Sequence, residues 1–441
     1  MITYSIIQKS KLEGALRLNA EYYQPEYLEV AKKIVDFGKY HYFGDLIEIF
    51  NSGKNWSQIE RGNIKFLRTQ HIRDILIRDE EDLTFCDGMP AQHFLLKEGD
   101  LLFTRVGGVS DSSIASKKYE GHFYSDNILR IRIKKLNSFF VSVFLNSYYG
   151  KSQLERAMKG VAQPLISREN FEKLKIPQPK IEFQEEIEKL VLKAYDYRNQ
   201  SLFLYSQAEN LLLEKLGLKD FKLKDDLSYI VNLSEIKFFH RADAEYFQPK
   251  YSKIIHSFSG DKKPLKIIAR RKTKKIKIIK EKDYGYIEIS DVNVGSREIS
   301  FNTVKGHELP ANAKMRIDGG ELIISKVRPT RGAVVIIPDS WNKNFIASGA
   351  FSIFEIESPL REYLQVLLRS IIGKLQLEKS TTGTSYPIIK DRDVENLLIP
   401  ILPKPIQQKI ADLVQKSHKT LSKTKILLEE SKQKVEKLIE R

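Results

Sequence analysis

Two loops at matching places in the chain combine cationic side chains with glycine, a composition suited to holding phosphate groups. The first, residues 103–108, carries Arg105 before two glycines, and its counterpart, residues 324–332, carries three cations: Lys326, Arg328 and Arg331. Glycine lets the backbone approach a ligand closely, so cationic side chains and backbone N–H groups can clamp phosphates together. A hairpin with solvated charges competes as an interpretation of either loop alone. Recurrence at matching places favours phosphate contact.

A second pair of matching loops carries hydroxyl and amide side chains. Residues 159–164 contain Gln163, and residues 381–387 contain Thr384 and Ser385. Such groups can hydrogen-bond to phosphates or to base edges, so these three residues are candidates for base reading or for loop support. A plain turn also accounts for the glycine and proline of both loops.

Near the start of each half, polar residues occupy matching places but differ in chemistry. Residues 68–73 offer three candidate contacts, Arg68, Gln70 and His71, whereas residues 288–293 carry a different set of polar groups. Matched scaffolds with unmatched polar residues are expected if each half reads a different sequence.

The charge of the chain favours a polyanionic partner. The 441 residues carry a net charge of +16 with a pI near 9.4, which indicates nucleic acid or an anionic membrane surface. No apolar stretch approaches the roughly 18–20 residues that span a bilayer, and the first residues do not resemble a signal peptide. We therefore expect a cytoplasmic protein without a membrane partner.

A basic run strengthens this expectation in the second half only. Residues 270–280 place seven cations in eleven positions. The run is either a solvated strand edge that discourages aggregation or a segment that lies along phosphates, and we favour phosphate contact without sequence specificity.

Motifs for catalysis are missing from the sequence. There is no Gly-x-Gly and no phosphate-cradling glycine-lysine loop, and the eight histidines lack the spacing of metal ligands. Cys86 is the only cysteine, which excludes an intrachain disulfide and a cysteine-rich zinc site. We expect no catalytic residue, no metal and no cofactor bound directly by this chain.

The chain is an internal duplication. Residues 17–27 return as residues 241–251 with seven of eleven positions identical, and residues 147–155 return as residues 370–378 with six of nine matching. Between these anchors the shift drifts by only a few residues, which indicates small loop insertions on one shared scaffold.

Each half ends in a long segment without Gly or Pro, residues 181–216 and 406–441. Apolar and small residues recur there in alternating steps of four and three, the period of a coiled-coil seam. The seam positions that we expect to pack are Ile187, Leu190, Ala194, Leu204, Ile410, Val414, Leu421 and Leu428. We expect the two helices to pair as a rod of roughly 50 Å with a globular domain near each end. The alternative is that each helix packs on its own domain.

The predicted fold class is α+β, with two pseudo-repeated mixed α/β domains joined by two long antiparallel helices. Proline-rich boundaries separate the globular regions from the helices, and residues 128–133 and 351–356 read as matching strands. We predict domains at 1–179 and 218–403 and spacer helices at 180–217 and 404–441.

These features together resemble the specificity subunit of type I restriction-modification systems. The resemblance rests on the tandem repeat, the Arg-x-x-Ala-Glu-Tyr opening, the Gly-Asp/Glu-Leu strand with its cationic loop, and the proline-rich helix starts with Gln184 and Gln407. It implies two target recognition domains that each bind half of a bipartite DNA site. It also implies two methyltransferase subunits as partners, which would supply S-adenosylmethionine chemistry. Restriction subunits can join such complexes and would supply ATP/Mg-dependent chemistry.

Two other classes of function compete with this interpretation. A coiled-coil scaffold with repeated protein-binding domains explains the duplication and the helices, but it leaves the charge and the paired cationic loops unexplained. A self-sufficient methyltransferase or nuclease would need the motifs that the sequence lacks.

Overall fold

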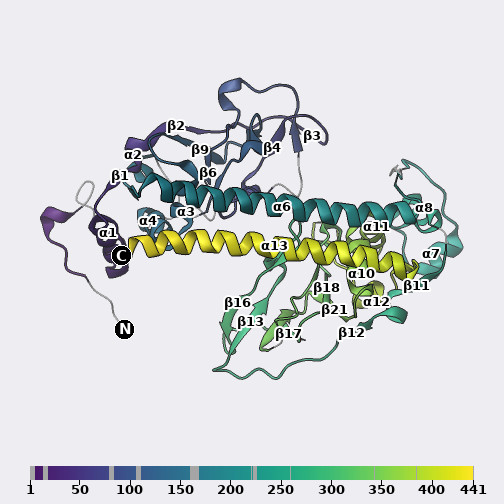
Figure 1. The fold of residues 1–441 in the computed structure, drawn as a ribbon. Coiled ribbons are helices and arrows are strands. Elements are labelled where there is room, and N and C mark those ends of the chain that lie inside the picture. The colour runs from purple at the N-terminus through teal and green to yellow at the C-terminus, as the bar shows by residue number, and fades with distance from the viewer. Residues whose placement is uncertain are drawn as a thin grey trace. The chain divides into compact units, whose positions relative to one another are not determined.

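The chain divides into two compact units in the computed structural model (Figure 1). The structure describes residues 5–12, 18–78, 84–105, 111–158, 168–219, 221, 226–258, 260–341, 343–383 and 385–440. Unit 1 comprises residues 1–199 and 420–441, and unit 2 comprises residues 200–419. This division cuts the long helices α6 (Ile181–Lys215) and α13 (Lys404–Ile439), whereas the predicted boundaries set both helices apart as spacers.

Unit 1 contains two four-stranded sheets. The first is antiparallel, in the order β2 (Ile47–Ser52), β9 (Ile128–Ile133), β6 (Leu101–Thr104) and β7 (Ser112–Ile114). The second has the order β3 (Gln58–Ile59), β5 (Thr84–Cys86), β4 (Lys65–Leu67) and β8 (Phe123–Tyr124). Within it β4 and β8 run parallel.

Unit 2 repeats both sheets. Its antiparallel sheet has the order β12 (Arg270–Arg271), β21 (Phe351–Glu355), β18 (Leu322–Ser325) and β19 (Val334–Ile336). Its second sheet has the order β16 (Asn302–Lys305), β13 (Asp283–Ile287), β20 (Phe345–Ser348) and β17 (Ala313–Ile317), with β13 and β20 parallel. The duplication therefore extends to sheet order, and it breaks only at an edge strand: β3 pairs with β5, whereas β17 pairs with β20.

Short two-stranded ladders and helices complete the units. The ladders pair β1 (Tyr40–Tyr42) with β10 (Lys175–Pro177), β11 (Lys262–Pro264) with β22 (Leu398–Pro400), and β14 (Val292–Asn293) with β15 (Glu298–Ile299). The remaining α-helices are α1 (Pro25–Asp36), α2 (Phe43–Leu46), α3 (Ser138–Asn146), α4 (Tyr148–Met158), α5 (Arg168–Glu172), α7 (Leu233–Phe239), α8 (Pro249–Ser257), α9 (Leu265–Ile268), α10 (Leu360–Arg369), α11 (Ile371–Lys379) and α12 (Asp391–Glu395). The 3-10 turns are η1 (Lys9–Lys11), η2 (Ala20–Tyr23), η3 (Thr69–His71), η4 (Gln92–Phe94), η5 (Lys117–Tyr119), η6 (Ala244–Phe247), η7 (Ile289–Asp291) and η8 (Pro329–Arg331).

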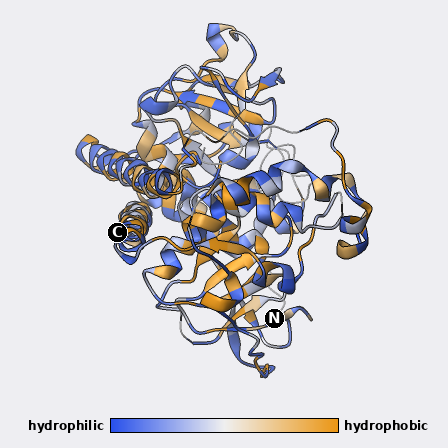
Figure 2. Ribbon diagram, turned by 90° about the vertical axis from the view of Figure 1, so that its right-hand side faces the viewer, coloured by the Kyte–Doolittle hydropathy of each residue, from blue (hydrophilic) through white to orange (hydrophobic). Residues whose placement is uncertain are grey.

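Each unit has its own hydrophobic core. The predicted strands at 128–133 and 351–356 are confirmed by β9 and β21, whose buried residues Ile131 and Phe354 lie in the cores of units 1 and 2. Hydrophobic residues concentrate on the strands and on the helices that cover them (Figure 2). The helix pair α3–α4 lies against β7 in unit 1, and α10–α11 lies against β19 and η8 in unit 2.

The long helices are antiparallel, as predicted. In unit 1 the Thr424 hydroxyl donates to the Ala194 carbonyl at 3.3 Å, and Lys434 pairs with Glu186 at 2.7 Å. In unit 2 the hydroxyls of Ser201 and Ser417 lie 2.9 Å apart. Residue numbers in α13 fall as those in α6 rise, and the small seam residues let the backbones approach closely. The predicted fold class is confirmed.

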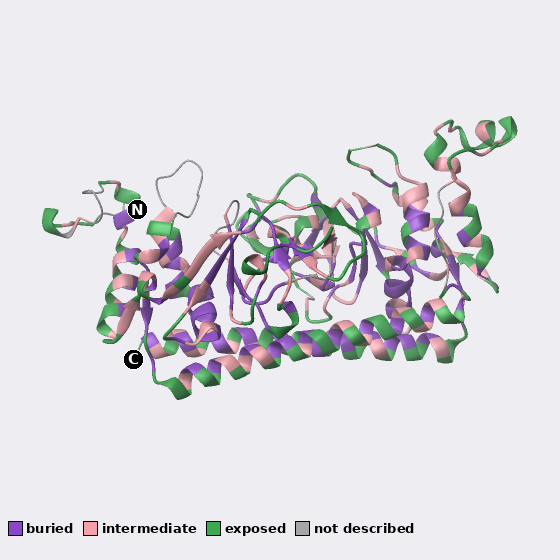
Figure 3. Ribbon diagram, turned by 90° about the horizontal axis from the view of Figure 1, so that it is seen from above, coloured by how far each residue is buried: buried purple, intermediate pink, exposed green. Residues whose placement is uncertain are grey.

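The seam on α13 follows the predicted period, whereas on α6 every second buried position lies one residue after the predicted one, which rotates the buried face in part. Ile410, Val414, Leu421 and Leu428 are buried, and so are Ile187 and Ala194 on α6. Leu190 and Leu204 are only half-buried, because the next residues, Val191 and Tyr205, take the buried positions. The alternation of buried and exposed residues along the helices can be followed in Figure 3.

The rotation has a physical cause in the flank of α6. Tyr195 accepts a hydrogen bond from the Ile77 amide at 3.1 Å, and the Arg198 guanidinium donates to the Ile77 carbonyl at 2.7 Å. The helix therefore packs on its own globular domain as well as on α13, so its buried stripe lies between the two contacts. The predicted helix pairing therefore describes the flank of α6 that faces α13, and the alternative, packing on its own domain, describes the other flank.

The second repeat anchor consists of scaffold residues. Gln153 on α4 exchanges two hydrogen bonds with the backbone of Lys175, at 3.0 and 2.9 Å, and Gln376 on α11 does the same with Leu398, at 2.9 and 2.7 Å. These amides hold the strand that precedes each long helix. No helix among the described residues is long and apolar enough to cross a membrane.

Candidate nucleic-acid interface

In unit 1 two of the predicted contact sites, the turn that begins at Arg68 and the residue Arg105, lie near the carboxyl ends of the parallel strands β4 and β8. The Ser125 amide after β8 donates to Leu67 at the end of β4 at 2.9 Å, and the Arg105 amide after β6 donates to Asn127 at 2.9 Å. These bonds bring η3, the bend at 125–127 and Arg105 to one edge, which we call the carboxyl edge of unit 1. Arg105 is half-buried there.

Unit 2 builds the same edge. Ile287 of β13 pairs with Ala347 of β20, and the Lys326 amide donates to Ala350 at 2.8 Å. The Arg328 amide in turn donates to Pro387 at 2.8 Å, which adds residues 385–388. The carboxyl edge of unit 2 therefore comprises η7, the bend at 348–350, the cationic loop 326–331 and residues 385–388.

His71 supports the η3 turn and is not exposed. Its side chain is 1% exposed, and its Nδ1 accepts the Arg68 amide at 3.1 Å. Arg68 is half-buried, with its guanidinium 3.4 Å from the Thr84 hydroxyl. Gln70 at the middle of the turn is exposed. Of the three predicted contacts in this turn, Gln70 alone presents its side chain fully to solvent.

The η7 turn of unit 2 has the same internal support. The Asp291 carboxylate accepts the Glu288 amide at 2.8 Å, as His71 accepts that of Arg68. Burial raises the pKa of Asp291 above its ordinary value, against the effect of this hydrogen bond. The exposed side chains are Glu288 and Ser290, joined by a hydrogen bond of 2.7 Å from the serine hydroxyl.

Lys326 is engaged inside the protein rather than presented to solvent. Its ammonium group lies 3.1 Å from the Asp391 carboxylate, and its side chain is 18% exposed. Burial acts to raise the pKa of Asp391, but hydrogen bonds from Ser352 and Lys326 outweigh it and the pKa lies below its ordinary value. The pair fastens the cationic loop to α12, so Lys326 is a weaker candidate for phosphate contact than the sequence predicts.

Arg328 and Arg331 differ in their surroundings. Arg328 adopts a left-handed conformation with φ 46°, donates to the Ser385 carbonyl at 3.3 Å and lies over the Tyr386 ring at 5.1 Å. Arg331 is exposed, as is Ser385. Tyr386, 55% exposed, is a candidate that sequence reasoning missed. An aromatic residue inside a predicted polar loop was the available signal, because aromatic side chains and arginine both stack on bases.

The basic run forms a strap across the second sheet of unit 2. Ile276 and Ile278 point inward and pack on the cluster that contains Tyr284 and Tyr286. The exposed cations are Arg270, Lys274, Lys275, Lys277 and Lys280. Arg271 and Lys272 are instead paired with carboxylates, Glu395 at 2.6 Å and Asp318 at 2.8 Å. The inward isoleucines hold this segment against the sheet, and the lysines between and beside them are exposed.

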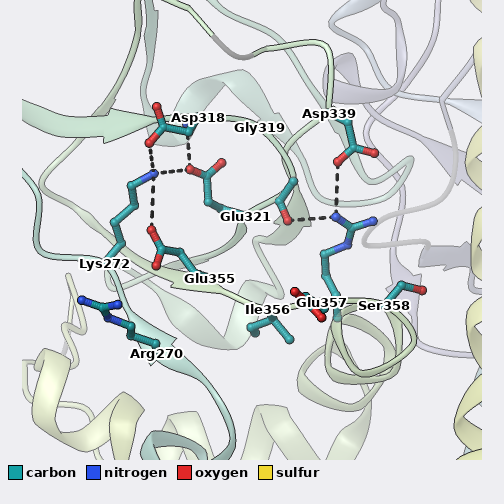
Figure 4. A pocket seen from close by; sticks show the side chains of 12 residues that line it. Arg270, Lys272, Asp318, Gly319, Glu321, Asp339, Glu355, Ile356, Glu357 and Ser358 are labelled. Carbon is teal, nitrogen blue, oxygen red and sulfur yellow. Dashed lines mark hydrogen bonds and ion pairs between the residues drawn. The ribbon is translucent and has the colours of Figure 1, made fainter.

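Lys272 borders a cavity of about 580 Å³ in unit 2 (Figure 4). Its ammonium group points toward the carboxylates of Asp318, Glu321 and Glu355. Burial acts to lower the pKa of Lys272, but the hydrogen bonds and charges of Asp318 and Glu321 outweigh it and raise the pKa above its ordinary value. The lysine is therefore a neutralising cation and not a base.

Two predicted contacts, Gln163 and Thr384, lie outside the described residues, as do residues 106–108 of the first cationic loop. Within the described ranges, no group of three or more His, Cys, Asp or Glu side chains could hold a metal ion. Burial raises the pKa of the Cys86 thiol to about 11, so it is protonated at neutral pH.

Comparison with known proteins gives one family and several relatives. The family model of the type I restriction modification DNA specificity domain matches residues 43–202 and 265–436. The chain is 21% identical over 414 residues to the type I restriction enzyme MjaVIII specificity subunit of Methanocaldococcus jannaschii, covering 90% of each chain.

Solved structures of such subunits are also similar. The S subunit of a type I restriction-modification system from M. genitalium is 11% identical, covering 91% of this chain and 94% of that chain, with a TM-score of 0.42. The HsdS subunit from Thermoanaerobacter tengcongensis is 13% identical, covering 91% and 96%, with a TM-score of 0.30.

Proposed function

Because the chain belongs to the family of type I restriction modification DNA specificity domains, we propose that it reads a bipartite double-stranded DNA target, one half-site with each unit. The observation that carries the proposal is the pair of carboxyl edges. They share strand order and turn supports, yet they present different polar side chains: Gln70 in unit 1, and Glu288 and Ser290 in unit 2. Two edges with the same backbone but different exposed side chains are suited to bind two different DNA sequences.

Affinity in this proposal comes from phosphate contacts. The exposed cations Arg331, Lys274, Lys275 and Lys277 supply sequence-independent attraction, consistent with the net charge of +16. Arg328 adds a cation that can contact phosphates, and Tyr386, whose ring lies beside it, adds an aromatic surface on which a base can stack.

The long helices set the spacer and dock the partners in this proposal. α6 and α13 are 35 and 36 residues long, roughly 50 Å each, and their pairing in both units suits a ruler between half-sites. The partners are two methyltransferase subunits, and restriction subunits can join the complex. The chain itself is non-catalytic here, so S-adenosylmethionine and ATP with Mg²⁺ belong to those partners.

The test is a map of adenine methylation by long-read sequencing in cells that express this chain with and without its neighbouring methyltransferase subunit. We expect a bipartite motif that requires both proteins. Exchange of residues 220–399 for those of a relative should then change one half-site and leave the other intact. The proposal is contradicted if no methylation motif appears even when both proteins are expressed, or if the exchange changes both half-sites. Either result would favour a scaffold protein.

A further inference from the structure

We infer that η3 and η7 are the specificity-determining turns of the two carboxyl edges, with Gln70 reading an adenine in one half-site and Glu288 with Ser290 reading a cytosine in the other. The inference deepens the proposed function and rests on it, since it names the side chains that contact bases and the bases that they select.

The two turns have nearly the same backbone. The residue before the turn has φ −111° and ψ 166° at Arg68, and φ −120° and ψ 177° at Glu288. The residue after it has φ −95° and ψ 101° at Ile72, and φ −96° and ψ 110° at Val292. Both turns follow the strand that runs parallel to its neighbour, so the scaffold delivers the middle residue to the same place in each unit.

The internal support of each turn keeps its geometry independent of the exposed side chains. The third residue accepts the amide three positions earlier, through imidazole at His71 and through carboxylate at Asp291. Two different acceptors hold one conformation. Gln70 and Ser290, the exposed residues that lie between donor and acceptor, are therefore free to vary without a change in the backbone, as a residue that selects a base must be. Glu288 takes the place of Arg68 before the turn and is exposed beside Ser290.

The exposed groups differ in their hydrogen-bonding capacity. A Gln amide can both accept from N6 and donate to N7 of adenine, whereas a Glu carboxylate only accepts, which suits N4 of cytosine. The Ser290 hydroxyl donates a hydrogen bond of 2.7 Å to the Glu288 carboxylate and so orients it. Unit 1 therefore presents an adenine-selective group and unit 2 a cytosine-selective pair.

The cationic loops place phosphate contacts at the same edges. Lys326 and Arg328 connect η8 to the bend at 348–350 and to residues 385–388. Arg369 on α10 donates to the carbonyls of Val294, which follows β14 after η7, and of Gly332, just past η8. This brace fixes the distance between the turn and the loop. Phosphate contacts then set the register of the turn on the bases.

The experiment replaces the amide of Gln70 by a carboxylate and the carboxylate of Glu288 by an amide, without a change in side-chain shape. The chain is expressed with its methyltransferase subunit, and methylation rates are measured on duplexes randomised within both half-sites. We expect Gln70→Glu to shift one position of one half-site from adenine to cytosine, and Glu288→Gln to shift one position of the other from cytosine to adenine, each by roughly 10-fold or more in preference. Because both residues are exposed, the variants should fold as the parent does.

Matched controls use the same substitutions away from the carboxyl edges. Gln92 in η4 and Glu357 after β21 are exposed, and both lie toward the opposite ends of the strands. Gln92→Glu and Glu357→Gln should leave both half-sites unchanged. Unchanged base preferences in both turn variants, with a clear motif for the parent, would overturn the inference. A parent that yields no motif would overturn the proposed function as well.

Discussion

Lys272 and Glu321, which lie 49 residues apart in the sequence, form an ion pair in which each side chain is only 3% exposed. Unit 1 keeps a carboxylate at the same place before its strand, Asp100, but neutralises it with Arg132 of β9 at 2.7 Å. Both carboxylates also accept the amide three residues earlier, at 2.8 Å for Lys97 and 2.7 Å for Asp318. The duplication preserved the buried anion and exchanged the cation.

Loss of one partner of this pair should be costly. Lys272→Met leaves Glu321 buried with less compensation, and we expect the free energy of unfolding of unit 2 to fall by roughly 3–5 kcal/mol. In a Trp56→Phe background Trp341 is the only tryptophan, so its fluorescence during urea unfolding reports unit 2. Lys274→Met, a change of an exposed lysine two residues away, should alter stability by less than about 0.5 kcal/mol. Equal effects of the two substitutions would contradict the buried pair.

Stability of unit 2 should depend on the protonation of His418. Burial lowers its pKa from 6.5 to about 4, helped by the charge of Arg297 and opposed by Glu362. The unfolded chain takes up a proton near pH 6.5 and the folded chain only near pH 4. The stabilisation is therefore complete above pH 6.5 and is lost as the pH falls toward 4, up to about 3 kcal/mol.

His418→Gln removes this titration. Urea unfolding of unit 2 should lose less free energy between pH 7 and pH 4.5 in the variant than in the parent, since carboxylates titrate in both. The same Trp341 fluorescence measures both proteins. Parallel pH profiles would show that His418 titrates alike in the folded and unfolded chains.

A glycine at the corner between α10 and α11 should not tolerate a side chain. A Cβ on Gly373 would lie 2.3 Å from both the Cα and the carbonyl oxygen of Leu368, and Gly150 of unit 1 has the same conflict with Phe144 at 2.1 Å. We expect Gly373→Ala to destabilise unit 2 by about 3 kcal/mol or more. Gly349→Ala is the control, because its Cβ would meet only Asn312 O at an ordinary 3.4 Å. A thermal unfolding comparison decides, and similar midpoints would refute the close approach.

Lys326 and Arg331 should separate into a structural and a DNA-binding cation. Lys326→Met removes the nearer of two cations beside Asp391 and leaves Arg271 at 3.7 Å, and we expect about 1–2 kcal/mol of destabilisation. Arg331→Gln should leave stability unchanged while it weakens binding to all DNA sequences and lowers the salt dependence by about one phosphate contact. Urea unfolding and binding of the complex to DNA at several salt concentrations test both. An Arg331 variant with unaltered salt dependence would remove this residue from the interface.

The sequence by itself determined the duplication, the strands β9 and β21, and the period of α13, because these depend on local order and on residue type. A helix that packs on one surface keeps a regular spacing of buried residues, so the seam that includes Ile410, Val414 and Leu421 can be read from the sequence. The repeated segments likewise contain residues that support the fold. Gln153 and Gln376 recur because each hydrogen-bonds to the strand before a long helix.

Tertiary structure alone decided which polar residues are free for contact. His71 and Gln70 are neighbours in sequence, yet one is buried under its own turn and the other is exposed. Lys326 is held by Asp391, 65 residues away, and Arg328 meets Tyr386 from another loop. The rotated face of α6 similarly arises from a second contact on its flank. Pairings between distant segments leave no periodic trace in the sequence, so the exposure of a polar side chain follows only from the folded chain.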